Sequence, residues 1–257
     1  MKLSRRSVMK TGIAGLVAFG AAPLVASTAS AQDAPANTIP VQGGQLVIHP
    51  VSHASLVLVA GDTVIYADPV GEASAYQSFP PPDLIVITHE HSDHFNADTL
   101  SALVGEKTKL ITNPAVFEKL PEKLRGIASP LANGEKTEAA GIAIEAIPAH
   151  NTTPERLQYH PKGRDNGYIL TLAGARVYLA GDTEDIPEMR ALKNIALAFV
   201  PMNLPYTMTV EQAASAVNEF KPKVVYPYHY NGSDVEQFKR LVEQGGGEIE
   251  VRLAKWY

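Results

Sequence analysis

Short apolar runs separated by turn residues follow one another from residue 45 to the end of the chain. Runs of roughly four to eight apolar or alternating residues, bounded by Gly, Pro, Asn or Asp, are typical of β-strands. This pattern predicts strands at residues 46–49, 55–59, 63–67, 83–88, 108–112, 142–147, 167–172, 176–179, 195–200, 224–228 and 249–253. Apolar positions three and four residues apart predict helices at residues 96–105, 114–125, 209–220 and 234–243.

The predicted elements fall into two successive halves, each with strands followed by helices. This order favours an α/β fold in which two mixed sheets pack face to face and the helices lie outside. No internal repeat and no shift in composition divides the chain, so we predict a single domain over residues 44–257. Residues 32–43 are rich in Ala, Pro, Asn and Gln and are expected to form a flexible lead-in.

Residues 1–31 have the composition of a targeting segment rather than of a folded element. An apolar stretch at 11–25 and the small residues at 29–31 follow a basic start, whose charges are Lys2, Arg5, Arg6 and Lys10. Residues 4–10 resemble a twin-arginine export signal, which predicts recognition by the twin-arginine machinery and a periplasmic or secreted protein. A general secretory signal and an uncleaved membrane anchor are the alternatives.

Charge and composition narrow the possible partners of the mature chain. Without the four basic residues of the export segment, 18 basic residues stand against 27 acidic ones, a net charge of −9. Such a chain lacks the basic surface that binds nucleic acid, so no nucleic-acid partner is expected. No apolar run after residue 31 is long enough to cross a bilayer, which predicts no stable membrane insertion of the mature chain. The chain contains no Cys, which excludes thiolate metal ligands and disulfides.

A group of potential metal ligands follows the predicted strand at 83–88, in the order His89-x-His91-x-Asp93-His94. In extended chain, residues two apart project to the same side, so His89 and His91 can reach one ion. Asp93 and His94 are adjacent and diverge, which makes them available to a second ion nearby. Imidazole and carboxylate groups are suitable ligands for zinc, manganese or iron.

Three further polar residues stand just beyond apolar runs of the second half. They are His150, Asp182 and His229, which follow the strands predicted at 142–147, 176–179 and 224–228. An ionisable side chain beside a buried strand needs a partner, and a shared metal site would supply one.

This ordered set resembles the metallo-β-lactamase fold superfamily over nearly the whole mature chain. The resemblance implies a four-layer αββα sandwich and a site for two divalent metal ions, with zinc expected and manganese or iron as alternatives. It assigns His89, His91 and His150 to one ion, Asp93, His94 and His229 to the other, and Asp182 to a bridging position.

The resemblance also implies a hydrolase that uses a metal-bound hydroxide on a small ester, lactone or phosphoester, with Asp93 as a residue that orients the nucleophile. Residues 201–208 and the turn at His53 are similar to the L-ascorbate-6-phosphate lactonase-like branch, and residues 201–208 are expected to form part of the pocket wall. A β-lactamase is the alternative among hydrolases. An iron-dependent redox enzyme and a metal-binding protein without catalysis are alternatives from other classes.

Other polar residues receive weaker predictions. His160 lies in a loop that can cover the metals, and we predict that it acts as leaving-group acid or oxyanion donor. Lys162 and Arg164 are candidates for contact with an anionic small-molecule substrate, although a merely exposed pair is expected more often. His53 is either a structural residue or a substrate contact. Asp68 is a candidate hydrogen-bond acceptor for a ligand His.

Overall fold

The structure, a computed structural model, describes residues 37–257. The predicted export segment at residues 1–31 lies outside the described residues. The expectation of a flexible lead-in over residues 32–43 is wrong in its last part, because Thr38–Val41 forms the first strand, β1. This strand pairs with the next one through a tight turn and buries Thr38 and Ile39, so the domain begins earlier than predicted.

The first half of the chain builds one sheet of seven strands, which are neighbours in chain order. Strands β1 to β4 run antiparallel, and strands β4 to β7 run parallel. The strands after β1 are β2 (Gly44–Ser52), β3 (Ser55–Ala60), β4 (Thr63–Ala67), β5 (Leu84–Ile87), β6 (Lys109–Thr112) and β7 (Ala128–Pro130).

The second half builds a second sheet of seven strands, again in chain order. Strands β8 to β11 run antiparallel, and strands β11 to β14 run parallel. These strands are β8 (Lys136–Ala139), β9 (Ile142–Ala149), β10 (Asp165–Leu172), β11 (Ala175–Leu179), β12 (Leu197–Pro201), β13 (Val224–Tyr228) and β14 (Glu250–Val251).

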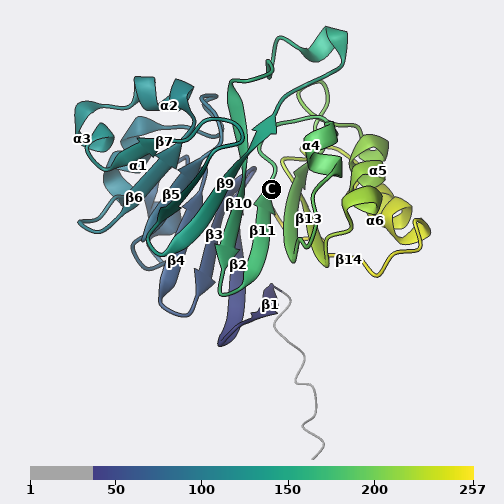
Figure 1. Ribbon diagram of the computed structural model, residues 1–257, viewed down its shortest axis with the longest axis horizontal. Coiled ribbons are helices and arrows are strands. Elements are labelled where there is room, and N and C mark those ends of the chain that lie inside the picture. The colour runs from purple at the N-terminus through teal and green to yellow at the C-terminus, as the bar shows by residue number, and fades with distance from the viewer. Residues whose placement is uncertain (1–36) are drawn as a thin grey trace, which may run out of the picture. The chain divides into compact units, whose positions relative to one another are not determined.

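The helices cover the outer faces of the two sheets. They are α1 (Ala97–Leu103), α2 (Pro114–Lys119), α3 (Glu122–Arg125), α4 (Pro187–Arg190), α5 (Val210–Phe220) and α6 (Val235–Gln244). Figure 1 shows α1 to α3 on one side of the sheets and α4 to α6 on the other. Two short 3-10 helices, η1 (Ala73–Tyr76) and η2 (Pro154–Arg156), lie in loops.

Three apolar cores correspond to this order of layers. The central core joins both sheets, with Leu56 from the first sheet and Leu170 from the second among its fully buried members. A second core lies under α1 to α3, and a third lies under α4 to α6. The predicted α/β fold with two mixed sheets face to face and helices outside is therefore confirmed.

One predicted helix is wrong in its extent. Residues 114–125 form two short helices rather than one, because Pro121 separates α2 from α3. Proline lacks a backbone N–H and clashes with the preceding turn, so a helix ends before it. Among the described residues, no helix has the length and apolarity needed to span a bilayer.

Candidate metal centre

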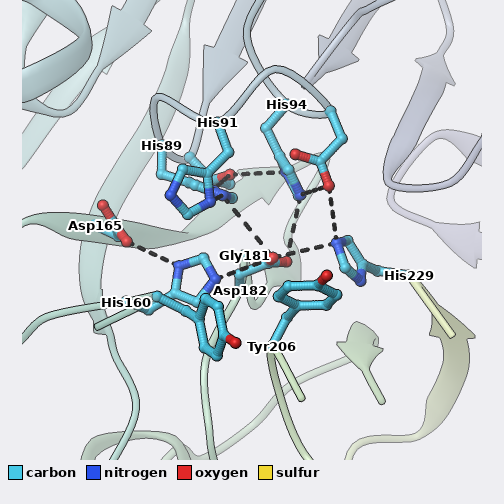
Figure 2. A network of polar contacts seen from close by, with 12 residues as sticks. His89, His91, His94, His160, Asp165, Gly181, Asp182, Tyr206 and His229 are labelled. Carbon is cyan, nitrogen blue, oxygen red and sulfur yellow. Dashed lines mark hydrogen bonds and ion pairs between the residues drawn. The ribbon is translucent and has the colours of Figure 1, made fainter. Parts of the chain in front are cut away.

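The loops that follow the parallel strands bring the predicted site residues to one end of the sandwich. His89 and His91 follow β5 of the first sheet, whereas Asp182 follows β11 and His229 follows β13 of the second. Figure 2 shows the rings of His89, His91 and His160 on one side of Asp182, and those of His94 and His229 on the other.

The first group of donors consists of His89, His91 and His160, whose ring nitrogens lie within 4.8 Å of one another. His89 Nε2 and His91 Nδ1 are 3.1 Å apart. The ring of His160 is centred 4.9 Å from that of His89 and 4.8 Å from that of His91. Three imidazoles converging in this way can share one ion.

His160 takes the place that the sequence analysis gave to His150. Among residues 37–257, no group of converging donor atoms includes His150. Its backbone is bound to the segment after β11: its N–H donates to Thr183 Oγ1 at 3.1 Å, and its carbonyl accepts from the N–H of Glu184 at 3.0 Å. The ring is buried, and burial lowers its pKa, with opposing charge effects from Glu188, Lys162 and Glu184. The assignment of His150 to an ion is therefore not supported by the geometry.

The second group consists of Asp93, His94 and His229, together with His53. Asp93 Oδ2 lies 3.4 Å from His229 Nε2 and 3.9 Å from His94 Nε2. The rings of His94 and His229 are stacked with their centres 5.2 Å apart. The first three are the residues expected on one ion from the sequence, and the structure brings all three together.

Asp182 lies between the two groups, as expected for a bridging carboxylate. Its Oδ2 is 3.4 Å from His160 Nε2 and 3.1 Å from His229 Nε2, so one oxygen faces donors of both groups. Its Oδ1 is 3.3 Å from His94 Nε2. The preceding residue, Gly181, has φ of +65°, and a Cβ there would lie 2.7 Å from the carbonyl oxygen of Asn166. Only glycine fits at this close crossing.

Buried carboxylates orient two of the histidines. The carboxylate of Asp68, which follows β4, accepts a hydrogen bond from His94 Nδ1 at 2.7 Å and also accepts from the backbone N–H and the hydroxyl of Thr88. Asp165 faces His160 Nδ1 at 3.0 Å in the same way. In both rings Nε2 is thereby directed toward Asp182, a common device for aligning metal-binding histidines. The contact expected for Asp68 is present, whereas Asp165 was not anticipated, although its position five residues after His160 is a usable signal.

The charges of the site compensate one another. Burial opposes ionisation of Asp182, but His229 and His94 hold its pKa well below the ordinary range. Burial likewise lowers the pKa of His229, but Asp182 and Asp93 outweigh it and raise this pKa to about 9. For His89, burial and the neighbouring histidines hold the pKa well below the ordinary value, so that ring is neutral. Positive charge beside Asp182 therefore stabilises its carboxylate, and the neutral imidazole of His89 has a lone pair available for a metal ion.

Unpartnered buried atoms test whether metal ions fit here. His94 Nε2, Asp182 Oδ1 and His229 Nε2 are buried and make no hydrogen bond among the described residues. Buried polar atoms of folded proteins are almost always hydrogen-bonded, so these three require another partner. All three belong to the converging groups, and imidazole and carboxylate are donors for zinc, manganese or iron. The residues present therefore fit divalent metal ions.

A pocket of about 520 Å³ opens onto these groups. It is lined by His53, Val70, His91, Ser92, Asp93, Tyr159, His160, Asp182, Asn203, Tyr206, His229 and Asn231. Residues 201–208 contribute to the wall as expected. Lys162 and Arg164 do not line it, and the guanidinium of Arg164 is bound to Asp165 at 2.7 and 2.9 Å.

Comparison with known proteins agrees with this geometry. The family described as the beta-lactamase superfamily domain matches residues 45–230. A UPF0173 metal-dependent hydrolase of Pyrococcus abyssi is 31% identical over 220 residues, which cover 80% of this chain and 94% of that protein. The crystal structure of a protein from Parabacteroides distasonis, assigned as a metal-dependent hydrolase, is 44% identical and superposes with a TM-score of 0.76 over 84% of this chain and 97% of the other.

A second solved structure has the same architecture. Igni18, a metallo hydrolase from Ignicoccus hospitalis, is 26% identical, with a TM-score of 0.68 over 82% of this chain and 95% of its own. The expected resemblance is thus confirmed by family, relatives and fold. The chain belongs to the beta-lactamase superfamily, as a metal-dependent hydrolase of the metallo-β-lactamase fold.

Proposed function

We propose that the protein is a dinuclear hydrolase that cleaves a small uncharged ester or lactone. The observation that carries the two-ion assignment is the position of Asp182 between two separate groups of donors. His89, His91 and His160 would hold one ion, and Asp93, His94 and His229 the other. Zinc is the expected metal, with manganese or iron as alternatives that the same ligands accept.

Two divalent ions in this position would lower the pKa of a coordinated water to roughly 7 and polarise the scissile carbonyl group. The protein's side chains align the metal-binding groups and keep other water molecules away from them. Asp68 and Asp165 fix the rings of His94 and His160, and the burial of these four side chains excludes competing water. His160 is better explained as a ligand than as the leaving-group acid first predicted, because its Nε2 faces Asp182.

Asp93 differs from the other donors because its side chain is 45% exposed and lines the pocket. The imidazoles of His229 and His53, whose Nε2 atoms lie 3.4 and 3.1 Å from Asp93 Oδ2, outweigh the burial of this carboxylate and hold its pKa below the ordinary range. An ionised carboxylate at the pocket surface can orient an attacking water by accepting a hydrogen bond from it through its free oxygen. We therefore assign to Asp93 the role of orienting the nucleophile.

The pocket wall indicates the substrate class. Among the described residues, its lining includes no Lys or Arg, and the polar side chains outside the donor groups are those of Ser92, Asn203, Asn231, Tyr159 and Tyr206. Phosphate groups are usually held by Arg, Lys or helix N-termini, whereas amide and phenol groups suit a neutral polar molecule. This favours an uncharged ester or lactone over a phosphoester.

A second hollow of about 390 Å³ shares Asn203 and Asn231 with the metal pocket. The exposed side chain of Leu204 and the buried Met208 contribute apolar surface to it. The two hollows together can accept a substrate that extends beyond the scissile bond. We therefore infer a substituent with some apolar character on one side of the ester.

The experiment that tests this function uses protein stripped of metal and reloaded with zinc, manganese or ferrous iron. We expect two ions per chain, and a higher kcat/KM for neutral esters and lactones than for phosphomonoesters, phosphodiesters or β-lactams. Asp182→Ala should lose bound metal and activity together, whereas Asp62→Asn, in an exposed turn, should retain both. One ion with full turnover would contradict the dinuclear site. A β-lactam preference, or oxygen consumption by the iron form, would favour an alternative activity.

We also propose that residues 1–31 direct export through the twin-arginine machinery, which places the enzyme in the periplasm or outside the cell. The support is the paired Arg5 and Arg6 within a weakly apolar, Cys-free leader. Expression in a bacterial host with and without that machinery, followed by fractionation, tests it. Arg5→Lys/Arg6→Lys should retain the protein in the cytoplasm, and export of this variant in the host that lacks the machinery would contradict the proposal.

A further inference from the structure

The turn between β2 and β3 places a histidine at the edge of the metal centre. His53 Nε2 lies 3.1 Å from Asp93 Oδ2, and its ring is centred 3.8 Å from that of His229. The residue has φ of +51°, a conformation that side chains other than glycine rarely adopt. Two backbone hydrogen bonds hold it there: its N–H donates to the carbonyl of Trp256 at 3.2 Å, and its carbonyl accepts from the N–H of His229 at 3.0 Å.

The other nitrogen of this ring meets a residue from the end of the described chain. Tyr257 Oη lies 2.7 Å from His53 Nδ1 and accepts a hydrogen bond from the backbone N–H of Asn231 at 3.1 Å. His53 and Tyr257 are 204 residues apart in sequence, so only the folded domain creates this contact. The segment after β14, in which Trp256 is buried, thus reaches back to the candidate metal centre.

The positions of the hydrogens are inferred from the contacts. A carboxylate oxygen is the acceptor of a hydrogen bond from imidazole, so Nε2, which faces Asp93 Oδ2 at 3.1 Å, carries a hydrogen. In the neutral ring Nδ1 is then an acceptor, and its donor is the hydroxyl of Tyr257, whose oxygen is already bound by a backbone N–H. One direction of hydrogen bonding satisfies every group: Asn231 to Tyr257, Tyr257 to His53, and His53 to Asp93.

We propose that His53 and Tyr257 are positioning residues, which orient the carboxylate of Asp93 toward an ion held with His94 and His229. The inference rests on the proposed second ion. The direction of the hydrogen bonds from Tyr257 to His53 and from His53 to Asp93, however, is a property of the protein without metal. Partners that orient metal-binding groups typically change metal affinity or activity by 10–100-fold when removed. We expect an effect of about 10-fold or more on the affinity of the second ion.

A different role for the same histidine is direct coordination. His53 offers a nitrogen within 4.8 Å of the donor atoms of Asp93, His94 and His229. The two roles require opposite tautomers, because a nitrogen that carries a hydrogen cannot bind a metal. The geometry favours the positioning role, since Nε2 makes a hydrogen bond with Asp93 and Nδ1 is engaged by Tyr257.

Two measurements test the proposal. The first is the 15N NMR spectrum of the histidine side chains of metal-free protein, in which His53→Gln identifies the His53 signals. We expect hydrogen on Nε2 and none on Nδ1, and a loss of this preference in Tyr257→Phe. The second is a chelator competition that measures the affinities of both ions in Tyr257→Phe, His53→Gln and His53→Ala. The control is Tyr230→Phe, which keeps the ring that packs against Tyr257 and removes a hydroxyl whose hydrogen bond among the described residues is to the carbonyl of Ala254.

The outcomes separate the possibilities. The proposal predicts that Tyr257→Phe and His53→Ala weaken the second ion while the first is unchanged. It also predicts that His53→Gln, whose amide can donate to Asp93, restores much of the affinity, and that Tyr230→Phe matches wild type. An equal loss of affinity for the second ion in His53→Gln and His53→Ala, with no effect of Tyr257→Phe, would establish direct coordination and overturn the proposal. A hydrogen on Nδ1 of His53 in the wild-type spectrum would also overturn it. Binding of only one ion by wild-type protein would instead refute the two-ion function, with the NMR result still deciding the hydrogen-bond direction.

Discussion

A buried ion pair fixes the loop that carries His160, and its removal gives the sharpest test of the stability of this domain. Arg156, in η2, has its Nε 2.8 Å from Glu184 Oε1, and the side chain of Glu184 is fully buried. The contact has ion-pair distance without hydrogen-bond geometry. The same guanidinium donates to the carbonyl of Thr207 and to Thr153 Oγ1, both at 2.7 Å. Arg156 thus ties three loops around the pocket together.

Arg156→Met keeps most of the side-chain volume and removes the charge. Breaking a buried ion pair from one side costs about 3–5 kcal/mol, because the remaining charge is left uncompensated. The other oxygen of Glu184 retains its hydrogen bonds from Thr152 and Thr153, so the lower end, about 3 kcal/mol, is expected. For a domain of this size that loss lowers Tm by about 6–12 °C.

The assay is urea unfolding of metal-free protein, compared for Arg156→Met, Glu184→Gln and the double variant. We expect the double variant to lose less stability than the sum of the single ones, by about 2 kcal/mol, since no buried charge remains in it. Arg240→Met is the control, because its ion pair with Asp234 is long, at 3.6 Å, and exposed. A loss below about 1 kcal/mol for Arg156→Met, or additive single losses, would refute this account of the ion pair.

Three further predictions concern the site and the sheet. His160→Ala should lower the metal content of folded protein, whereas His150→Ala should retain it; elemental analysis of both variants decides which histidine is the ligand. Gly181→Ala should lower the free energy of unfolding by about 2 kcal/mol or more and displace Asp182, because a Cβ there would lie 2.7 Å from a backbone oxygen. Thermal unfolding and metal content measure the two effects. A variant with unchanged stability and metal content would contradict the close crossing. Hydrogen bonds and positive charge from Lys136 and Arg176 hold the pKa of Glu145 below its ordinary value of 4.5. The ionised Glu145 therefore stabilises the folded protein above that pH, and this stabilisation is lost as pH falls through the lowered pKa. Glu145→Gln should therefore lose about 0.5 kcal/mol at pH 7 and nothing near pH 3, and equal losses at both pH values would contradict the assignment.

The strands and the order of the layers could be predicted from sequence because each depends on local pattern. Apolar runs bounded by turns locate β5 and β13, and polar residues directly after them locate His89 and His229. The same rule selected His150, which also follows a strand but does not converge with the other donors in the described part of the chain. The residue that the structure brings to this group is His160, because the backbone N–H of Asn151 donates to the carbonyl of His160 at 2.8 Å and closes the loop between them. Nothing in the local pattern reveals where such a loop returns.

Contacts between segments that are far apart in sequence are the other feature that sequence rules predict poorly. Asp68 could be proposed because it ends a strand, whereas the contact of Tyr257 with His53 depends on how the last residues cross the end of the sandwich. The break of a predicted helix at Pro121 was within reach of sequence rules, since proline is a recognised helix terminator. The pocket wall was only partly anticipated, because Tyr159 and Asn231 belong to loops without periodicity.

Each half of the chain folds into its own sheet, and each sheet supplies part of the donor set. His89 and His94 come from the first sheet, whereas Asp182 and His229 come from the second. A divalent ion bound among them acts as a reversible cross-link between the halves, comparable in effect to a disulfide in a chain that has no cysteine. Ligand linkage then makes resistance to unfolding rise with free metal, by about 2.7 kcal/mol at a hundred times Kd. The metal supply of its surroundings would set how long the folded enzyme survives, in addition to whether it works.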